Sequence, residues 1–277
     1  MEAPSHSDDR ELAGFPALAA LIRRMEAAGA ALRERRDPRR FFHATYLHTT
    51  RAVRAELAEG GFLDAAWVER WDVAFAALYL DALEASLHGR DVPGPWAAAF
   101  SADDAVAPLR HVLLGMNAHI NYDLPQALLA VISDAEFGDT ALLARREADH
   151  RHIDQVLAAL TGASEGPTQI ARRPRGLTAR LADRVNRAAT RRFLAEGRAK
   201  VWANAGVLAR ARREGRACYQ ARLAELEWLA TQRVADLTRP GPVLVRLGAR
   251  GFGVTLPGPQ PVTAAKLRRR RIDDHGI

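Results

Sequence analysis

The chain has 277 residues, of which 48% are hydrophobic and 6% aromatic, and it carries a formal net charge of +7. This length provides enough core for one large domain or two small ones, and no apolar run approaches the roughly 20 residues needed to span a bilayer. The single cysteine, Cys218, excludes a disulfide framework and a cysteine-rich metal site. The polar, acidic start of the chain does not resemble a secretory signal, so we expect a cytoplasmic protein.

The composition favours helices, because Ala, Leu and Arg are abundant and clusters of β-branched residues are missing. Asp64 is suited to cap a helix start, Gly89 is suited to end the same helix, and Pro125 should kink or interrupt a later one. In chain order, the expected helices cover 16–35, 39–58, 65–88, 96–100, 103–123, 139–160, 177–195, 198–213 and 217–237. Short loops between these helices predict an all-α, multi-helix antiparallel bundle.

The domain organisation follows from the segments that lack helical periodicity. Residues 1–10 are expected to be a disordered N-terminus, and 11–237 a single helical domain with a linker near 161–176, where Gly and Pro are frequent. Residues 238–277 should form an extended basic tail, because Gly and Pro recur every few residues between short apolar pieces.

The positive charge is concentrated in the second half of the chain, in the arginines of 172–222 and the run 268–271. Nucleic-acid binding is not expected from it, because aromatic residues are sparse and no nucleic-acid-binding motif accompanies the charge. An anionic small-molecule substrate would also suit this surface. The sequence leaves the oligomeric state open.

Several polar residues fall on the inward faces of the expected helices, since side chains advance by about 100° per residue. Tyr46 lies within the apolar stripe of 39–58, Asp72 and Tyr79 within that of 65–88, and Asp149 within that of 139–160. An aspartate is rarely buried without a partner, so these positions call for a compensating group.

The segment 109–124 is the richest in polar residues among apolar ones, and it predicts a central, buried helix. His111, His119 and Asp123 fall along one side, and Asn117 and Asn121 share another. His119 and Asp123 are four residues apart, the spacing at which two side chains of one helix can chelate an ion. Inward carboxylates on three helices, with few Lys or Arg on the same faces, predict a metal ion that supplies the missing positive charge.

The central block also resembles an uncharacterised bacterial family, a domain of unknown function. The likeness covers about residues 40–160 and brings no activity. It rests on four patterns: Phe42, Tyr46 and Thr50; Asp72, Phe75 and Ala76; the block from Asn117 to Leu124; and, in part, Asp149, Ile153 and Asp154.

A second resemblance is to the helical zinc phosphoesterases of the nuclease and bacterial phospholipase C group, which carry two His-x-x-x-Asp/Glu elements. This chain has His119 with Asp123, followed by Gln126, and later His150 with Asp154. The histidine that follows the Gln in that group is replaced here by Leu128, and its N-terminal Trp ligand is absent. The likeness implies at most one metal site, built from His119, Asp123 and Asp72.

Together these features predict a metal-dependent enzyme, a hydrolase that acts on a phosphate or other anionic ester through a metal-bound water. We expect His119, Asp123 and Asp72 as ligands of zinc, iron or manganese, His111, Asp149 and Tyr46 as catalytic groups, and Asn117, Asn121 and Tyr79 as substrate contacts.

Two alternatives remain open. The polar residues can form a structural core network in a non-catalytic helical protein that binds a small molecule or a partner. They can also hold iron in a non-haem metal oxidoreductase.

Overall fold

The computed structural model describes residues 14–103, 105–162, 177–239 and 251–258. Within these residues the chain forms helices and no strand, which confirms the expected all-α fold. The helices are α2 (Pro16–Glu34), α3 (Arg40–Ala58), α4 (Ala65–Leu87), α5 (Gly94–Phe100), α6 (Pro108–Ala118), the π-helix η1 (His119–Asp123), α7 (Leu124–Val131), the short η2 (Glu136–Gly138), α8 (Thr140–Gly162), α9 (Leu177–Glu214) and α10 (Arg216–Thr238). None of these helices combines the length and apolar character that crossing a bilayer requires.

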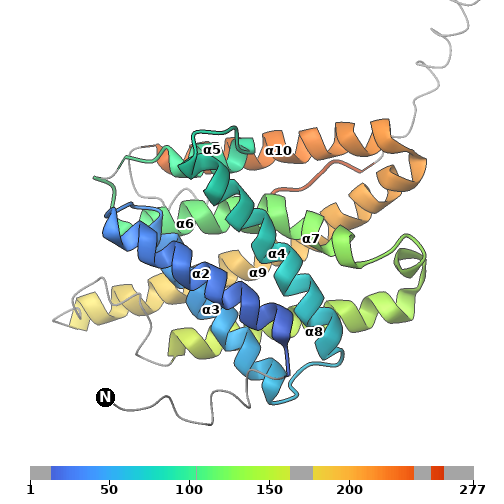
Figure 1. The fold of residues 1–277 in the computed structure, drawn as a ribbon, viewed down its shortest axis with the longest axis horizontal. Helices are drawn as coiled ribbons and strands as arrows, with labels where there is room; N and C mark the ends of the chain where they lie inside the picture. The colour runs from blue at the N-terminus through green and yellow to red at the C-terminus, as the bar shows by residue number, and fades with distance from the viewer. Residues whose placement is uncertain (1–13, 104, 163–176, 240–250, 259–277) are drawn as a thin grey trace, which may run out of the picture.

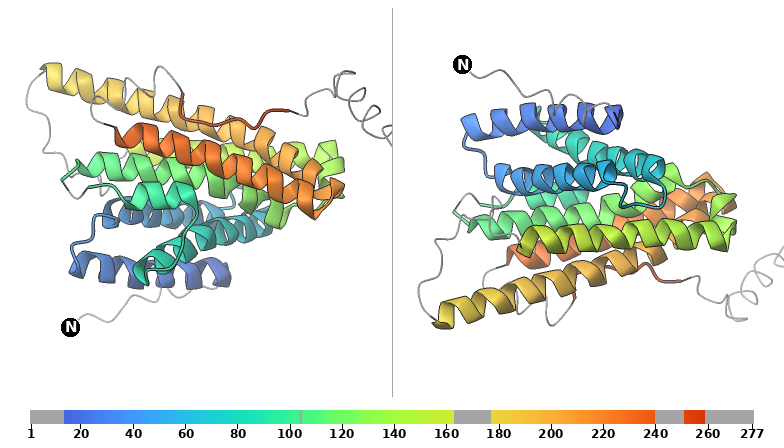
Figure 2. Two further views of the ribbon diagram at one scale, coloured as in Figure 1. Left: turned by 90° about the horizontal axis from the view of Figure 1, so that it is seen from above. Right: turned by 90° about the horizontal axis from the view of Figure 1, so that it is seen from below.

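The rod of α6, η1 and α7 lies in the middle of the fold. Figure 2 shows α2 and α3 on one side of it and α9 and α10 on the other. The short α5 packs against α10, and α4 packs against α7 (Figure 1). The rod is therefore surrounded by other helices, as the even distribution of apolar residues in 109–124 predicts.

Helix α4 begins and ends where the sequence predicts. The carboxylate of Asp64 accepts a hydrogen bond from the backbone N–H of Trp67 at 2.9 Å, and so satisfies a donor that the first helical turn leaves free. The helix stops before Gly89, which takes a positive φ of 65° that a side chain would disfavour.

Pro125 follows a π-helical turn of the central rod, and the helix continues beyond it. A proline has no N–H to donate, so the ordinary helical bond at this position is lost. The backbone N–H of Leu124 bonds to the carbonyl of His119, five residues back, and the chain continues as α7. The expected start of this helix near 103 was wrong, since α6 begins at Pro108.

The expected break between 195 and 198 was also wrong, because α9 is continuous from Leu177 to Glu214. Gly197 lies within this helix although glycine is a weak helix former, and a Cβ at this position would lie 2.8 Å from Cδ1 of Phe252. The residues 163–176 of the expected linker lie outside the described chain, and α8 reaches Gly162.

Candidate functional site

The π-helix η1 carries a buried histidine–aspartate pair. Nδ1 of His119 lies 2.8 Å from Oδ2 of Asp123, and the two side chains are 3% and 2% exposed. The indole Nε1–H of Trp96, on α5, donates to the same oxygen at 2.9 Å. Because Oδ2 accepts the indole proton, we assign it as the acceptor from His119 Nδ1–H as well, which leaves the lone pair of the imidazole on Nε2.

Aromatic side chains enclose the imidazole of His119. The ring of Phe75 stacks on it with centroids 3.5 Å apart, and the ring of Tyr46 meets it edge-on at 4.5 Å. Phe42 and Trp96 lie within 6 Å as well. In these apolar surroundings burial lowers the pKa of His119 well below its ordinary value, so the imidazole is neutral at physiological pH.

Burial acts on Asp123 in the opposite direction. It raises the pKa of the Asp123 carboxyl well above its ordinary value, and the hydrogen bond from Trp96 offsets part of the effect. A cation close to the pair would favour the ionised carboxylate.

Three buried polar atoms have no hydrogen-bond partner in the described structure: Nε2 of His119, Oη of Tyr46, whose ring contacts that of His119, and Oδ2 of Asp72. Burial raises the pKa of Tyr46 well above its ordinary value, the carboxylates of Asp72 and Asp123 raise it further, and the side chain of Thr50 lowers it in part. The hydroxyl of Tyr46 therefore lies within electrostatic range of both carboxylates.

Asp72 connects this group to a second set of buried polar residues. Burial raises its pKa to about 7, and the guanidinium of Arg198 lowers it in part. Next to Asp72 in the chain, Trp71 contacts His150, which in turn contacts Trp202, with ring centroids 5.3 and 5.5 Å apart. The ring nitrogens Nε1 of Trp71, Nε2 of His150 and Nε1 of Trp202 also lack hydrogen-bond partners within the described residues.

The expected metal ligands form only part of a metal site. In the described part of the chain, no three His, Cys, Asp or Glu side chains lie together in a group that could hold an ion. Asp123 instead accepts two hydrogen bonds, from His119 and Trp96. His119 and Asp72 offer unpartnered atoms of the right chemistry, and Tyr46 is a third possible donor.

His111 and His119 do not meet at one centre. Eight residues separate them on the rod, which corresponds to about 12 Å along a helix axis. The ring of His111 stacks instead on Phe41, with centroids 5.9 Å apart. The catalytic role expected for His111 stays a prediction, and this residue lies away from His119.

The three expected substrate contacts all have partners within the chain. The amide groups of Asn117 and Asn121 each donate to the carbonyl of Phe252 at 3.1 Å. The hydroxyl of Tyr79 donates to Nδ1 of His43 at 3.0 Å, and Nε2–H of that histidine donates to the carbonyl of Met25. These side chains connect parts of the fold.

Asp149, expected as a catalytic group, caps the start of α4. Its two carboxylate oxygens accept hydrogen bonds from the backbone N–H groups of Leu63 at 2.7 Å and Asp64 at 3.0 Å. Both bonds join α8 to a loop more than 80 residues earlier in the chain. This is the arrangement of a structural carboxylate, with each oxygen satisfied.

Replacing Asp149 by Ala is expected to lower the free energy of unfolding by about 3 kcal/mol, because two backbone donors lose a charged acceptor. Asp149→Asn should cost less, since its amide oxygen still accepts one of the two bonds. Urea denaturation followed by circular dichroism measures both variants. Equal stability of Asp149→Ala and the wild type would contradict the capping role.

The sequence pattern did not reveal Trp96, whose indole holds Asp123, or the aromatic rings around His119. Trp96 lies in a turn-rich stretch where helical periodicity carries no information, and its contact with Asp123 spans 27 residues. Phe42 and Phe75 fall on apolar stripes, where an aromatic ring is ordinarily a core residue. Only the packing of α3, α4 and α5 around η1 brings them together.

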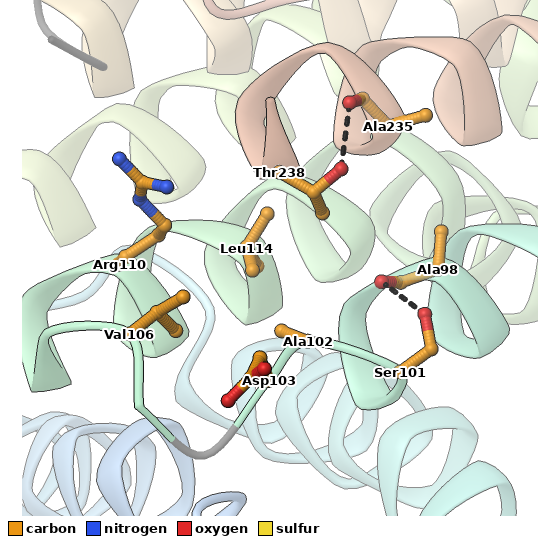
Figure 3. Close-up of a pocket in the computed structure, with 9 residues that line it drawn as sticks. All are labelled: Ala98, Ser101, Ala102, Asp103, Val106, Arg110, Leu114, Ala235 and Thr238. Atoms are coloured by element: carbon orange, nitrogen blue, oxygen red, sulfur yellow. Dashed lines mark hydrogen bonds between the residues drawn. The ribbon is translucent and has the colours of Figure 1, made fainter. Parts of the chain in front are cut away.

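A surface hollow of about 270 Å³ lies between α5, α6 and α10. Figure 3 shows the side chains that line it, among them Asp103, Arg110, Ala98 and Ala102. None of the expected site residues lines it. This hollow is therefore separate from the polar core around His119.

Residues 18–240 match a family of unknown function, DUF5995. The chain belongs to this family. The result confirms the expected membership in an uncharacterised family, and the matched range includes every residue of the polar core. No curated protein and no solved structure is significantly similar to the chain. The likeness to the zinc phosphoesterases stays a prediction.

Proposed function

We propose that the protein binds a small polar ligand inside its helical fold, in contact with His119, Tyr46 and Asp72. The observation that supports this most directly is the set of unpartnered atoms on these residues, which come from η1, α3 and α4. Each buried polar atom left without a partner costs about 1–3 kcal/mol, and folded proteins contain few of them. A ligand that pairs with Nε2 of His119, Oη of Tyr46 and Oδ2 of Asp72 would remove this cost.

A purely structural network would look different. The chain contains such networks at Asp149 and at Tyr79, and there the buried polar atoms are paired with defined partners. At His119 only the Nδ1 side of the ring is satisfied, and Nε2 remains available. A neutral imidazole held by a carboxylate on one nitrogen can accept a proton or bind an electrophile through the other.

A divalent metal is the second candidate for the ligand. Histidines that bind metals usually donate their other ring nitrogen to a carboxylate, as His119 does to Asp123. Zinc, iron or manganese held by His119 Nε2, with Asp72 and Tyr46, would offset the buried carboxylates, and Asp123 would orient the histidine without being a ligand. A hydrolase or an oxidoreductase acting on an anionic small molecule would follow from such a centre.

Two buried tyrosines allow a matched test. In protein dialysed against a chelator and refolded to remove any ligand, Tyr46→Phe is expected to raise the free energy of unfolding by about 1 kcal/mol, because it removes an unpartnered hydroxyl. Tyr79→Phe should lower it by about 1 kcal/mol, because its hydroxyl bonds to His43. Chemical denaturation measures both. A loss of stability in Tyr46→Phe as large as that in Tyr79→Phe would contradict the proposal.

The metal candidate is tested with His119→Asn, in which the amide nitrogen can still donate to Asp123 while the atom equivalent to Nε2 is removed. Plasma mass spectrometry should find near-stoichiometric zinc, iron or manganese in the purified wild type and none in the folded variant. Native mass spectrometry of the same samples detects a non-metal ligand by its mass. Absence of metal from the wild type, with failed reloading by each ion, would overturn the metal candidate.

A further inference from the structure

Residues 251–258 run beside α9 (Figure 2). The side chains of Phe252, Val254 and Leu256 are buried, whereas Thr255 is exposed. This alternation is that of an extended segment with one face against the protein.

Asparagine side chains bind the backbone of this segment at every second residue. The amide of Asn121 donates to the carbonyl of Phe252 and accepts from the N–H of Val254, at 3.1 and 3.0 Å. The amide of Asn204, on α9, donates to the carbonyl of Val254 and accepts from the N–H of Leu256, at 3.0 and 2.8 Å. Two side chains therefore take the place that a neighbouring strand would occupy.

Charged side chains bind the other residues of the segment. Lys200 donates to the carbonyl of Gly253 at 3.2 Å, and Arg233 donates to that of Gly251 at 3.1 Å. Arg222 donates to the carbonyl of Pro257. The segment is thus held by α9, α10 and the central rod through its backbone, and by its apolar side chains.

The fit between the segment and α9 is tight at two glycines. A Cβ on Gly253 would lie 2.9 Å from Cα of Gly197, and a Cβ on Gly197 would lie 2.8 Å from the ring of Phe252. The backbone of the segment can approach the helix only because neither residue has a side chain.

We propose that residues 251–257 form a strap that fixes the π-turn of η1 and thereby positions His119 and Asp123. Asn121 lies between these two residues on the same turn, and both of its polar groups are bound to the strap. Asn117, one turn earlier, donates to the same carbonyl of Phe252. The strap therefore holds the face of the rod opposite to the aromatic rings around His119.

The π-turn of η1 is an uncommon backbone conformation. Its i→i+5 pattern is rare and occurs mostly as single turns within α-helices, frequently at functional sites. The strap bonds fix the direction of Asn121, and since the backbone of the turn is continuous, they also fix the directions of His119 and Asp123. The inference that the strap positions His119 and Asp123 depends only on these contacts. Any effect of the strap on ligand affinity rests on the proposed function.

The test compares Gly253→Ala with Gly206→Ala in the full chain. Gly206 lies on α9, and a Cβ there would meet nothing within 4 Å. Two signals are measured in ligand-free protein: hydrogen exchange of the backbone in 251–258, and exchange of the His119 Nδ1 proton by nitrogen-15 NMR. We expect both exchange rates to rise about tenfold in Gly253→Ala, which corresponds to the loss of one or two hydrogen bonds. Both rates should be unchanged in Gly206→Ala.

A general loss of stability is controlled with Leu18→Ala, which removes a buried side chain of α2 far from the strap in sequence. This variant should leave the shift of the His119 Nδ1 proton unchanged, whereas release of the strap should change it. Asn204→Ala, which removes two strap bonds without altering η1, replaces Gly253→Ala if that variant does not fold. Faster exchange in 251–258 with an unchanged His119 proton would overturn the proposal. Because the readout needs no ligand, this result is independent of the Tyr46→Phe test.

Discussion

The contribution of Asp72 to the free energy of unfolding is expected to fall by up to about 4 kcal/mol as the pH rises from 3.8 to about 7. Below 3.8, its carboxyl is protonated in both the folded and the unfolded chain. Between the two values only the folded protein retains the proton, since burial raises the pKa of Asp72 to about 7. Above about 7 both states are ionised, and the folded state bears the cost of a buried carboxylate.

Urea denaturation across this pH range, with a chelator present, measures the effect in the wild type and in Asp72→Asn. The difference between the two proteins should decline with rising pH and level off near neutrality. Asp37 and Asp64 do not mask it, because hydrogen bonds to Arg39 and Arg146 lower the pKa values of these carboxyls, so their stabilising effect is lost only below 3.8. A difference that does not vary with pH would show that Asp72 is ionised throughout and paired.

Gly115→Ala is expected to lower the free energy of unfolding by about 2 kcal/mol, although alanine is the better helix former. A Cβ at this position would overlap the ring of Phe42 and lie 2.8 Å from its Cβ. The ring has little room to move, because it packs against Tyr79, Trp96 and His119. The added methyl group therefore displaces a ring of the aromatic enclosure around His119.

Gly206→Ala is the matched control for this change, as a helical glycine with open space around it. Its replacement should stabilise the protein by up to about 1 kcal/mol through the unfolded chain. Thermal unfolding and the near-ultraviolet circular dichroism of the aromatic rings distinguish the two variants. An equal gain in stability for both would mean that the rod and α3 separate easily, contrary to the tight packing described above.

The helices and their boundaries could be predicted where local chemistry decides them. The cap by Asp64, the stop at Gly89 and the interruption near Pro125 each depend on the backbone preferences of one residue. The prediction failed between 195 and 198, where Gly197 lies within the continuous helix α9. The strap that closes over this glycine is distant in sequence and could not be anticipated from it.

The composition and periodicity of the sequence by themselves determined that the fold is helical, that the rod around His119 is buried and that Asp72, Asp123 and Asp149 face inward. Only the tertiary structure decided the partner of each inward group. Helical periodicity specifies the face on which a side chain lies, but a hydrogen bond depends on which distant segment packs against that face. Asp149 therefore became a cap for α4, and Asn121 became an anchor for the strap, whereas the Nε2 atom of His119 was left available for a ligand.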